Sequence, residues 1–278
     1  MRCRARKNPS WGQTAFCRHD VQVFRTRWRK DVGVNTLALS RPGCVATAIV
    51  AEMKGRRLGF LYDNENPRSI CARLRRRRLR LLEGLISGLP TPVRILDVGG
   101  SESFWLVSGW LEDQSKNLHI TLINVDEEAS KTEGAGGQLI GLVGDACDLS
   151  RFSPGDFDIV FSNSVIEHVG NASMRERMAA EIRRLSDIYF VQTPNKYFPI
   201  EPHFLFPFFQ FLPLAIRCWL LQHMRLGWIA RRRDHDVAMK TVAEVDLLGE
   251  REFAGLFPDA TIKRERLLVT KSLMAIKS

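Results

Sequence analysis

The sequence has few of the features that mark secreted, zinc-binding or membrane-spanning proteins. Its six cysteines lie far apart, with no Cys-x-x-Cys pair and no spacing of Cys and His that suits zinc. The basic N-terminus, "MRCRARKNPSWGQ", lacks the apolar core of a signal peptide. The most apolar segment, "FLFPFFQFLPLAI", contains two prolines and a glutamine and is too short to cross a bilayer. We therefore expect a reduced, cytoplasmic protein without a transmembrane segment or a metal site.

Negative charge is scarce in the first third of the chain, where positive charge is concentrated. Residues 1–89 carry 20 Lys and Arg against 6 Asp and Glu, whereas residues 90–278 carry 21 against 25. A nucleic-acid-binding domain usually presents a strongly basic surface, so charge argues against that role for the larger part of the chain. With 278 residues, 45% of them hydrophobic, the chain can bury one large core.

The basic part of the chain divides into two segments. Residues 1–66 show no sustained hydrophobic periodicity, and we predict a poorly ordered or peripheral segment there. Residues 67–89 predict a cationic amphipathic helix, because apolar residues recur near helical spacing with arginines between them; these are Ile70, Leu74, Leu81, Leu82, Leu85 and Ile86. Such a helix either packs on the edge of the domain with a solvated arginine face, or contacts RNA or an anionic membrane.

Beyond residue 93, short apolar runs alternate with helical segments. Seven runs predict strands: "RILDV", "ITLINV", "QLIGLVG", "FDIVFSN", "IYFVQT", "ATIKRERL" and "SLMAIK". Near-continuous Val, Ile and Leu indicate strands buried on both faces, and hence a largely parallel sheet covered by helices. The last two strands follow each other without a helix between them.

Two helices are predicted among these strands. In "NASMRERMAAEIRRLSD", Ser173 and Glu176 have the spacing of a capping box. An apolar stripe follows in the same segment, made by Met174, Met178, Ile182 and Leu185. The segment "TVAEVDLLGEREFAGLF", residues 241–257, predicts a second helix that ends near Pro258.

Polar residues stand where four of the predicted strands end. Residues 97–101 close the first strand, Asp126 the second and Asp145 the third, and "SNSVIEHV" follows the fourth with Asn163 and His168. In an open α/β sheet, ligands bind beyond the carboxyl ends of the strands. The glycines allow a tight turn with backbone N–H groups close to a ligand. Asp126 can accept hydrogen bonds from both hydroxyls of a ribose, and Asp145 suits an adenine amino group.

The ordered motifs "ILDVGG", "INVD", "GDACDL" and "FDIVFSNSVIEHV" resemble those of class I S-adenosylmethionine-dependent methyltransferases, of the small-molecule, type 11-like kind. The resemblance covers about residues 93–278, so residues 67–278 are expected to form one domain. It implies an α/β, Rossmann-like fold: a seven-stranded, mostly parallel sheet with helices on both faces and an antiparallel last strand. It also implies S-adenosyl-L-methionine as the cofactor.

The resemblance assigns roles to the strand-end residues. Their shared role is cofactor binding: Asp97, Gly99, Gly100 and Ser101 toward the methionine moiety, Asp126 toward the ribose, Asp145 and Ala146 toward the adenine, with Asn163 at the same edge. The chain departs from the family at Ser101 and Ser103, where glycines are common. A serine hydroxyl there can still donate a hydrogen bond to the carboxylate of the cofactor.

A dinucleotide is the competing ligand for such a turn. A pyrophosphate favours three spaced glycines that open a helix, but this turn has two adjacent glycines, and Glu102 would repel the phosphates. A sulfonium that also bears an ammonium group tolerates acidic neighbours. The charges therefore favour the methyl donor.

Methyl transfer from a sulfonium requires the acceptor, the methyl carbon and the sulfur to be held in line, with a base where the acceptor loses a proton. His168 and His203 are the candidate catalytic bases. His203 lies in an apolar segment after the fifth strand, where Tyr197 and Glu201 are candidate substrate-binding residues. Because so apolar a segment would otherwise expose a large patch, we predict that residues 193–233 form an aromatic lid over the acceptor or a structural insertion.

We therefore expect a methyltransferase acting on a small-molecule, glycan-linked or lipid-linked acceptor. Two alternatives remain open. One is a nucleotide-sugar or dinucleotide enzyme on a related fold. The other is a non-catalytic module of the same fold that binds RNA or an anionic membrane through the arginines of residues 73–80. Nucleic acid is not the expected partner of the main domain, whereas peripheral membrane contact is compatible with the sequence.

Overall fold

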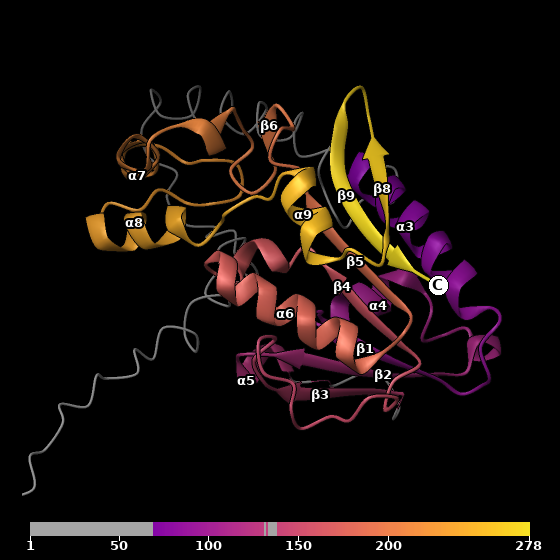
Figure 1. The fold of residues 1–278 in the computed structure, drawn as a ribbon. Coiled ribbons are helices and arrows are strands. Elements are labelled where there is room, and N and C mark those ends of the chain that lie inside the picture. Colours follow the sequence, from indigo (N-terminus) through magenta and orange to yellow (C-terminus); the bar gives the residue numbers. More distant parts are fainter. Residues whose placement is uncertain (1–68, 131, 133–137) are drawn as a thin grey trace, which may run out of the picture.

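The fold is described for residues 69–130, 132 and 138–278 in a computed structural model, so the segment predicted at residues 1–66 lies outside the described residues. Seven strands form one sheet in the order β3-β2-β1-β4-β5-β9-β8 (Figure 1). Their bounds are β1 Val93–Val98, β2 Leu118–Asn124, β3 Leu139–Val143, β4 Ile159–Asn163, β5 Tyr189–Pro194, β8 Thr261–Arg266 and β9 Thr270–Lys277. Each of the seven predicted strands is present.

The pairing of the strands fixes the fold class. β1 pairs in parallel with β2 and β4, β2 with β3, and β4 with β5. β9 pairs antiparallel with β5 on one side and with β8 on the other, so in this sheet the last strand runs against its neighbours. The predicted Rossmann-like α/β fold with an antiparallel last strand is confirmed.

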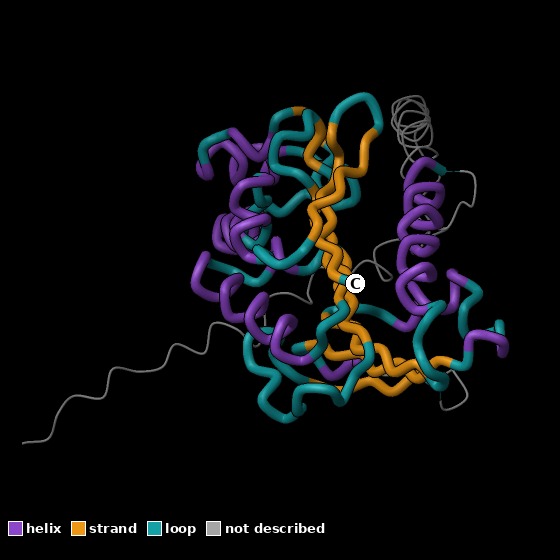
Figure 2. The backbone as a smooth tube through the Cα atoms, turned by 45° about the vertical axis from the view of Figure 1, so that its right-hand side comes forward, coloured by secondary structure: helices purple, strands orange, loops and turns teal. Residues whose placement is uncertain are grey.

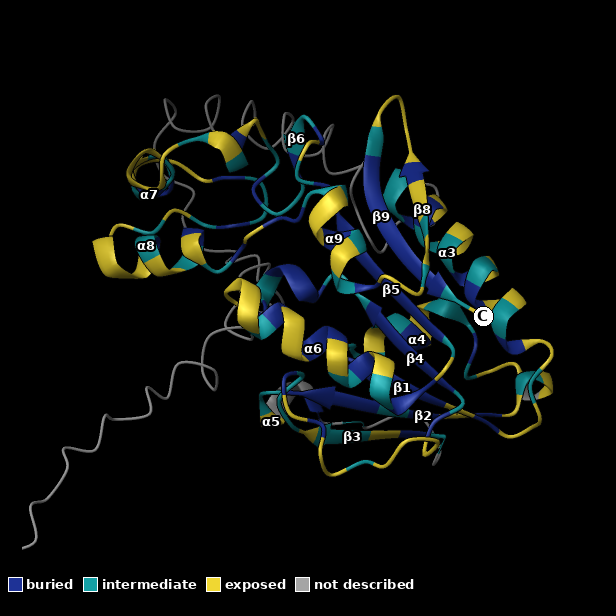
Figure 3. Cartoon of the chain, viewed as in Figure 1, coloured by how far each residue is buried: buried dark blue, intermediate teal, exposed yellow. Residues whose placement is uncertain are grey.

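Helices cover both faces of the sheet (Figure 2). On one face, α3 (Ile70–Ile86) and α4 (Glu102–Ser108) pack against the strands through residues such as Leu82 and Trp105. On the other face lie α6 (Ala172–Leu185) and α9 (Glu250–Leu256), which contribute Met178 and Phe253. The central strands are buried almost throughout, as Figure 3 shows. Burial on both faces explains why their sequences are continuously apolar.

α6 shows one local error of the sequence prediction. Its N-cap is Asn171, whose side chain accepts a hydrogen bond from Met174 N, so the predicted capping box of Ser173 and Glu176 is wrong. Gly170 has a φ of 100°, which turns the chain so that the helix begins two residues earlier. The apolar stripe itself is confirmed, because Met178, Ile182 and Leu185 are fully buried and Met174 packs against the same core.

The single helix predicted over residues 241–257 is also wrong. The structure has α8 (His235–Ala243) and α9, separated by residues 244–249. The linking segment is extended beside the end of β5, where Lys196 N donates to Leu248 O. Val245 packs into one hydrophobic cluster and Leu248 into another, so the apolar spacing of this segment serves two cores rather than one helical face.

Residues 195–248, here called the insertion, connect β5 to α9. They contain β6 (Ile200–Glu201), β7 (Phe206–Pro207), the 3-10 turn η3 (Phe209–Phe211), α7 (Leu214–His223) and α8. The insertion has its own hydrophobic core, formed by Phe204, Phe209, Cys218, Leu221, Leu226, Ile229, Ala238, Val242, Val245 and Leu247. Much of the apolar sequence that suggested a lid is therefore used to hold the insertion together.

The remaining elements are short. They are η1 (Gln114–Lys116), α5 (Glu127–Ser130) and η2 (Ile166–His168). η2 follows β4 directly and contacts the end of the insertion, because Asp246 N donates to Glu167 O. Among the described residues, no helix combines the length and the apolar character needed to cross a bilayer.

Candidate active site

The carboxyl ends of four parallel strands form one edge of the sheet. After β3 the chain crosses back over β2 and β1 to place β4 beside β1, so the topology switches between β1 and β4. Ser162 Oγ donates to Val98 O across this junction. Ligands of open α/β sheets bind outside the strand ends at such a switch point. The structure brings the residues predicted after β1, β2, β3 and β4 to this edge.

The turn after β1 requires both of its glycines. Gly99 has a φ of 73°, and a Cβ there would lie 2.6 Å from Cγ1 of Val165. A Cβ on Gly100 would overlap the carboxylate of Asp97. Asp97 is only 1% exposed, and its Oδ2 accepts a hydrogen bond of 2.8 Å from Trp105 Nε1. The two adjacent glycines are thus explained by close approach on both sides of the turn.

Ser101 departs from the family pattern without disturbing this turn. Its φ of −139° and ψ of 146° are extended backbone that any residue adopts, so no glycine is needed. Ser101 stands directly before α4, and its hydroxyl lies 3.1 Å from that of Ser103. The two serine hydroxyls therefore lie together beside the turn.

The acidic residues after β2 and β3 lie on the neighbouring strand ends. Asp126 follows β2, and its backbone carbonyl accepts hydrogen bonds from the backbone and side chain of Ser130. Asp145 follows β3, and its Oδ1 accepts from Cys147 N at 2.8 Å. This hydrogen bond folds the carboxylate back over Ala146 and so fixes the local turn. Cys147 itself is buried.

Asn163, at the end of β4, has a partner that the sequence did not suggest. Nη1 of Arg78, from α3, donates to Asn163 Oδ1 and to Gln192 Oε1 at 2.7 Å each. Arg78 was placed on a solvated face, yet it lies four residues from both Leu74 and Leu82, which are buried. Its position in the middle of the apolar stripe was the signal that could have identified it.

The last two strands, β8 and β9, place two more charged side chains near Arg78. Glu265 of β8 is 1% exposed, and its Oε1 lies 3.5 Å from Nε of Arg78. Lys271 of β9 is also buried; burial lowers the pKa of Lys271, and the positive charge of Arg78 lowers it further. No pattern in the sequence distinguishes Glu265 or Lys271. They create a buried charged group between α3 and the sheet, with positive charge next to the strand ends.

Two predicted bases, His168 and His203, lie together. Their rings stand edge to face, with centroids 4.9 Å apart. His168 ends η2, and His203 lies in the β6–β7 turn of the insertion. Nδ1 of His203 lies 2.6 Å from Oε1 of Glu201, a carboxylate that is 1% exposed and also accepts from Phe204 N. The insertion therefore carries an oriented imidazole to the residues that follow β4.

Glu167 completes this group. The side chain is buried, Oε2 accepts a hydrogen bond from Thr193 Oγ1 at the end of β5, and Oε1 lies 4.0 Å from Nε2 of His168. Nδ1 of His168 faces the backbone carbonyl of Glu244 at 3.3 Å. We call Glu167, His168 and His203 the histidine cluster. The sequence patterns predict roles for both histidines but not for Glu167.

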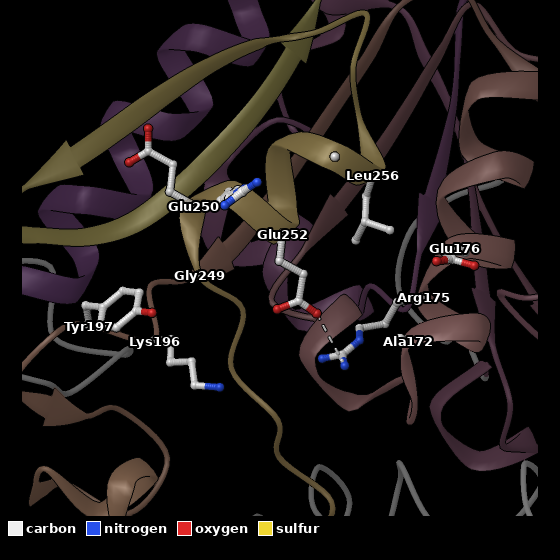
Figure 4. Close-up of a pocket in the computed structure, with 11 residues that line it drawn as sticks. Ala172, Arg175, Glu176, Lys196, Tyr197, Gly249, Glu250, Glu252 and Leu256 are labelled. Carbon is white, nitrogen blue, oxygen red and sulfur yellow. Dashed lines mark ion pairs between the residues drawn. The ribbon is translucent and has the colours of Figure 1, made fainter.

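Tyr197, the remaining predicted residue, lies elsewhere. Its side chain is 68% exposed and packs against Phe211 and Gly249. It lines a hollow of about 620 Å³ together with residues of α6 and α9, among them Arg175 and Glu252, which form an ion pair of 3.4 Å (Figure 4). No residue of the histidine cluster or of the glycine turn lines this hollow.

The chain was compared with known proteins. The family model of a methyltransferase domain matches residues 96–187. No curated protein matches the sequence. Solved structures that are similar include an O-methyltransferase family protein from Burkholderia thailandensis, with 14% identity, a TM-score of 0.43, and coverage of 79% of this chain and 64% of that one.

Two further similar structures are also methyltransferases. An S-adenosylmethionine-dependent methyltransferase from Methanosarcina mazei has 18% identity and a TM-score of 0.42, covering 70% of this chain and 94% of that one. One from Aquifex aeolicus has 14% identity and a TM-score of 0.44, covering 81% and 96%. The residues matched by the family model include Asp97, Asp126, Asp145 and Asn163, whereas the insertion lies outside them.

Proposed function

We propose that the chain transfers a methyl group from S-adenosylmethionine to a small-molecule, glycan-linked or lipid-linked acceptor; the match of residues 96–187 to the model of a methyltransferase domain supports this. One observation carries the proposal: the double-glycine turn after β1 lies on the same sheet edge as Asp126, Asp145 and Asn163. A fold alone does not establish an activity, whereas these residues can bind a specific ligand.

The residues present fit the cofactor. Gly99 and Gly100 have no side chains and lie in a crowded turn, so their backbone N–H groups can come close to the methionine moiety. The buried carboxylate of Asp97 accepts a hydrogen bond from Trp105 and so supports this turn from inside the protein. The hydroxyl of Ser101 lies beside the turn. Asp126 would accept from the ribose hydroxyls, and Asp145 with Ala146 would border the adenine.

Charge at the strand ends is consistent with this assignment. The cofactor carries a sulfonium and an ammonium group, which suit the acidic residues after β1, β2 and β3. Its carboxylate suits a positive group, and Arg78 supplies one at the end of β4, held by Asn163 and Gln192. We propose that Asn163 serves the cofactor through this arginine.

When bound, S-adenosylmethionine supplies an electrophilic methyl carbon, which moves from sulfur to the acceptor. The chain's own part is to orient the acceptor and to take its proton. We assign the proton to Nε2 of His203, because Glu201 accepts from Nδ1–H and so leaves Nε2 as the basic atom. Glu201 is a positioning residue in this scheme, and His168 supports the second imidazole edge to face.

The insertion limits what the acceptor site can be. It delivers His203 from the β6–β7 turn and closes against η2 through Asp246 N and Glu167 O. We propose that it forms the wall of the acceptor site and excludes water from the reacting groups. Tyr197 would contribute only to an acceptor long enough to extend to the hollow of Figure 4.

The proposal is tested by titrating the folded chain with S-adenosylhomocysteine in a calorimeter. Wild type and the matched control Glu112→Ala, an exposed carboxylate in the segment between α4 and β2, are expected to bind alike. Asp126→Ala is expected to lose binding while its melting temperature stays within about 4 °C, the shift that roughly 1 kcal/mol produces. No heat with folded wild type would contradict the proposal, and global unfolding of Asp126→Ala would make Asp126 structural.

Exposed arginines favour a second candidate. Four side chains of α3 point to solvent: Arg73, Arg76, Arg77 and Arg80. They are compatible with a non-catalytic module that binds RNA or an anionic membrane. Such a module would bind nucleic acid or liposomes with a steep salt dependence and would show no affinity for S-adenosylhomocysteine.

A further inference from the structure

The histidine cluster has the composition and spacing of a metal site. One ligand atom from each of Glu167, His168 and His203 lies within 4.8 Å of the others. Two imidazoles and one carboxylate are a donor set used by zinc and by non-haem iron, with positions left open for another ligand. We propose that these three side chains bind a single divalent transition-metal ion of the zinc class.

Each imidazole is already oriented for such an ion. Nδ1 of His203 is hydrogen-bonded to the buried carboxylate of Glu201, and Nδ1 of His168 faces the carbonyl of Glu244. In metalloproteins the second ring nitrogen of a ligating histidine usually donates to a carboxylate or a backbone carbonyl, which fixes the tautomer that binds through Nε2. Both kinds of acceptor are present here, one for each ring.

An ion requires the ligand atoms to move closer together, because they lie within 4.8 Å of one another, at most about 1.5 Å more than in a tetrahedral site. Ligand bonds of roughly 2.0–2.1 Å place two tetrahedral ligands about 3.3 Å apart. Oε1 of Glu167 and Nε2 of His168 are 4.0 Å apart, so an ion between them needs a closure of less than about 1 Å. Glu167 is fixed at both ends, because its Oε2 accepts from Thr193 and its backbone carbonyl accepts from Asp246 N.

Burial gives the ion a physical reason to bind. Glu167 and Glu201 are both 1% exposed and belong to the same small group. Buried carboxylates are costly unless positive charge compensates them. A protonated His203 would balance one of the two. The positive charge of Lys271 also acts on Glu167 and that of Arg217 on Glu201, and a divalent cation on Nε2 of both histidines and on Glu167 would add positive charge between the two carboxylates.

The position of the cluster connects the ion to the reaction. Val165, two residues before Glu167, packs against Gly99 of the cofactor turn. An ion with three protein ligands would retain an open position for a hydroxyl oxygen of the acceptor and would lower the pKa of that hydroxyl, so that its proton passes to solvent; with the ion bound, Nε2 of His203 is a ligand and not the base that it is in the ion-free chain. This role rests on the proposed function, whereas metal binding itself does not.

The test uses the full, untagged chain, stripped of metal with a chelator. Zn²⁺ alone is titrated by calorimetry, and Co²⁺ alone is followed by its visible absorption, which is intense for tetrahedral coordination. We expect one ion per chain. His203→Ala and Glu167→Gln should abolish binding, and Glu201→Gln should weaken it about 10–100-fold, as removal of an outer partner does.

His223→Ala is the matched control, since His223 is exposed on α7 and lies outside the cluster. It should bind Zn²⁺ like wild type. Circular dichroism verifies that each variant is folded. Absence of stoichiometric binding to wild type, or equal binding by wild type, His203→Ala and Glu167→Gln, would overturn the proposal.

Titration with S-adenosylhomocysteine, in the metal-free and the Zn²⁺-loaded chain, separates the two proposals. Cofactor binding without metal binding contradicts the proposed metal site and supports the proposed function. Metal binding without cofactor binding supports the ion site and contradicts the methyltransferase function.

Discussion

Arg78 of α3 lies 2.7 Å from Asn163 at the end of β4, although 85 residues separate the two in the sequence. The same Nη1 donates to Gln192 at the end of β5, and Nε faces the buried carboxylate of Glu265. Hydrogen bonds and an ion pair of Arg78 therefore connect α3 to the edge of the sheet where the cofactor would bind. Removal of the Arg78 side chain should therefore affect both the stability of the fold and the cofactor site.

Replacing Arg78 tests this tie. In Arg78→Ala the buried carboxylate of Glu265 loses one of two positive neighbours, the other being Lys271, and two amide oxygens lose a donor. We expect the free energy of unfolding to fall by about 3–5 kcal/mol, the usual effect of removing one member of a buried ion pair. Urea denaturation measures it. Arg77→Ala, on the exposed side of α3, should change stability by about 0.5 kcal/mol or less.

A double variant sharpens the result. Because Arg78→Ala and Glu265→Gln each break the same pair, the loss of stability in the double variant should be smaller than the sum of the two single losses, with Lys271 present in all three. A loss below about 1 kcal/mol in Arg78→Ala, or strictly additive losses, would show that Arg78 and Glu265 are not energetically coupled.

Gly100 gives a prediction about the cofactor turn. A Cβ there overlaps the carboxylate of Asp97, which cannot move freely because Trp105 donates to it. Gly100→Ala should therefore displace the turn and lower affinity for S-adenosylhomocysteine by tenfold or more, about 1.4 kcal/mol. Gly88→Ala, where nothing lies within 4 Å of the added Cβ, is the control and should bind like wild type. Equal affinities for both variants would contradict a role for this turn.

The fold could be predicted because its signals are local. The central strands are buried on both faces, so their Val, Ile and Leu runs are unbroken and recognisable. The helix predicted over residues 241–257 failed because apolar spacing does not reveal which core a residue enters: Val242 packs in the insertion and Phe253 under the sheet. The cap of α6 failed because Asn171 and Ser173 are both good N-caps, and the turn at Gly170 decides between them.

The site could be predicted in part. The strand-end residues were accessible because parallel strands place their carboxyl ends at one edge, whatever the loops do. The pairing of His168 with His203 was not, because it depends on how the insertion folds back onto η2. Arg78 stood in a run of arginines, and only its register against Leu74 and Leu82 distinguished it.

Asp259 leads to a prediction about pH. Burial alone would raise the pKa of this carboxyl, but hydrogen bonds from Tyr189 and Lys277 outweigh burial and lower the pKa to about 2. A carboxyl whose folded pKa lies below its unfolded value, near 3.9, stabilises the fold above that value, and the effect is lost as pH falls toward about 2.

The stability difference between wild type and Asp259→Asn should therefore be constant above about pH 5 and should shrink between about pH 4 and 2. Thermal unfolding at half-unit pH steps measures it. Glu112→Gln, an exposed carboxylate elsewhere, shows how much of any change is common to the whole chain. A difference that stays constant down to pH 3 would mean that Tyr189 and Lys277 do not hold Asp259 in solution.

The two faces of α3 allow the two candidate functions, methyl transfer and binding of RNA or an anionic membrane, to be tested separately. The inward face carries Arg78 and reaches the strand ends, whereas Arg73, Arg76, Arg77 and Arg80 are exposed. Changing these four arginines to glutamine should leave affinity for S-adenosylhomocysteine within about 0.5 kcal/mol, roughly twofold. Any salt-dependent binding to vesicles of anionic lipid, or to RNA, should disappear, because it depends on these charges. Calorimetry and vesicle sedimentation measure the two properties independently. If the fourfold variant instead loses the cofactor while remaining folded, then the outer face of α3 acts on the site, and α3 is not divided as its burial pattern indicates.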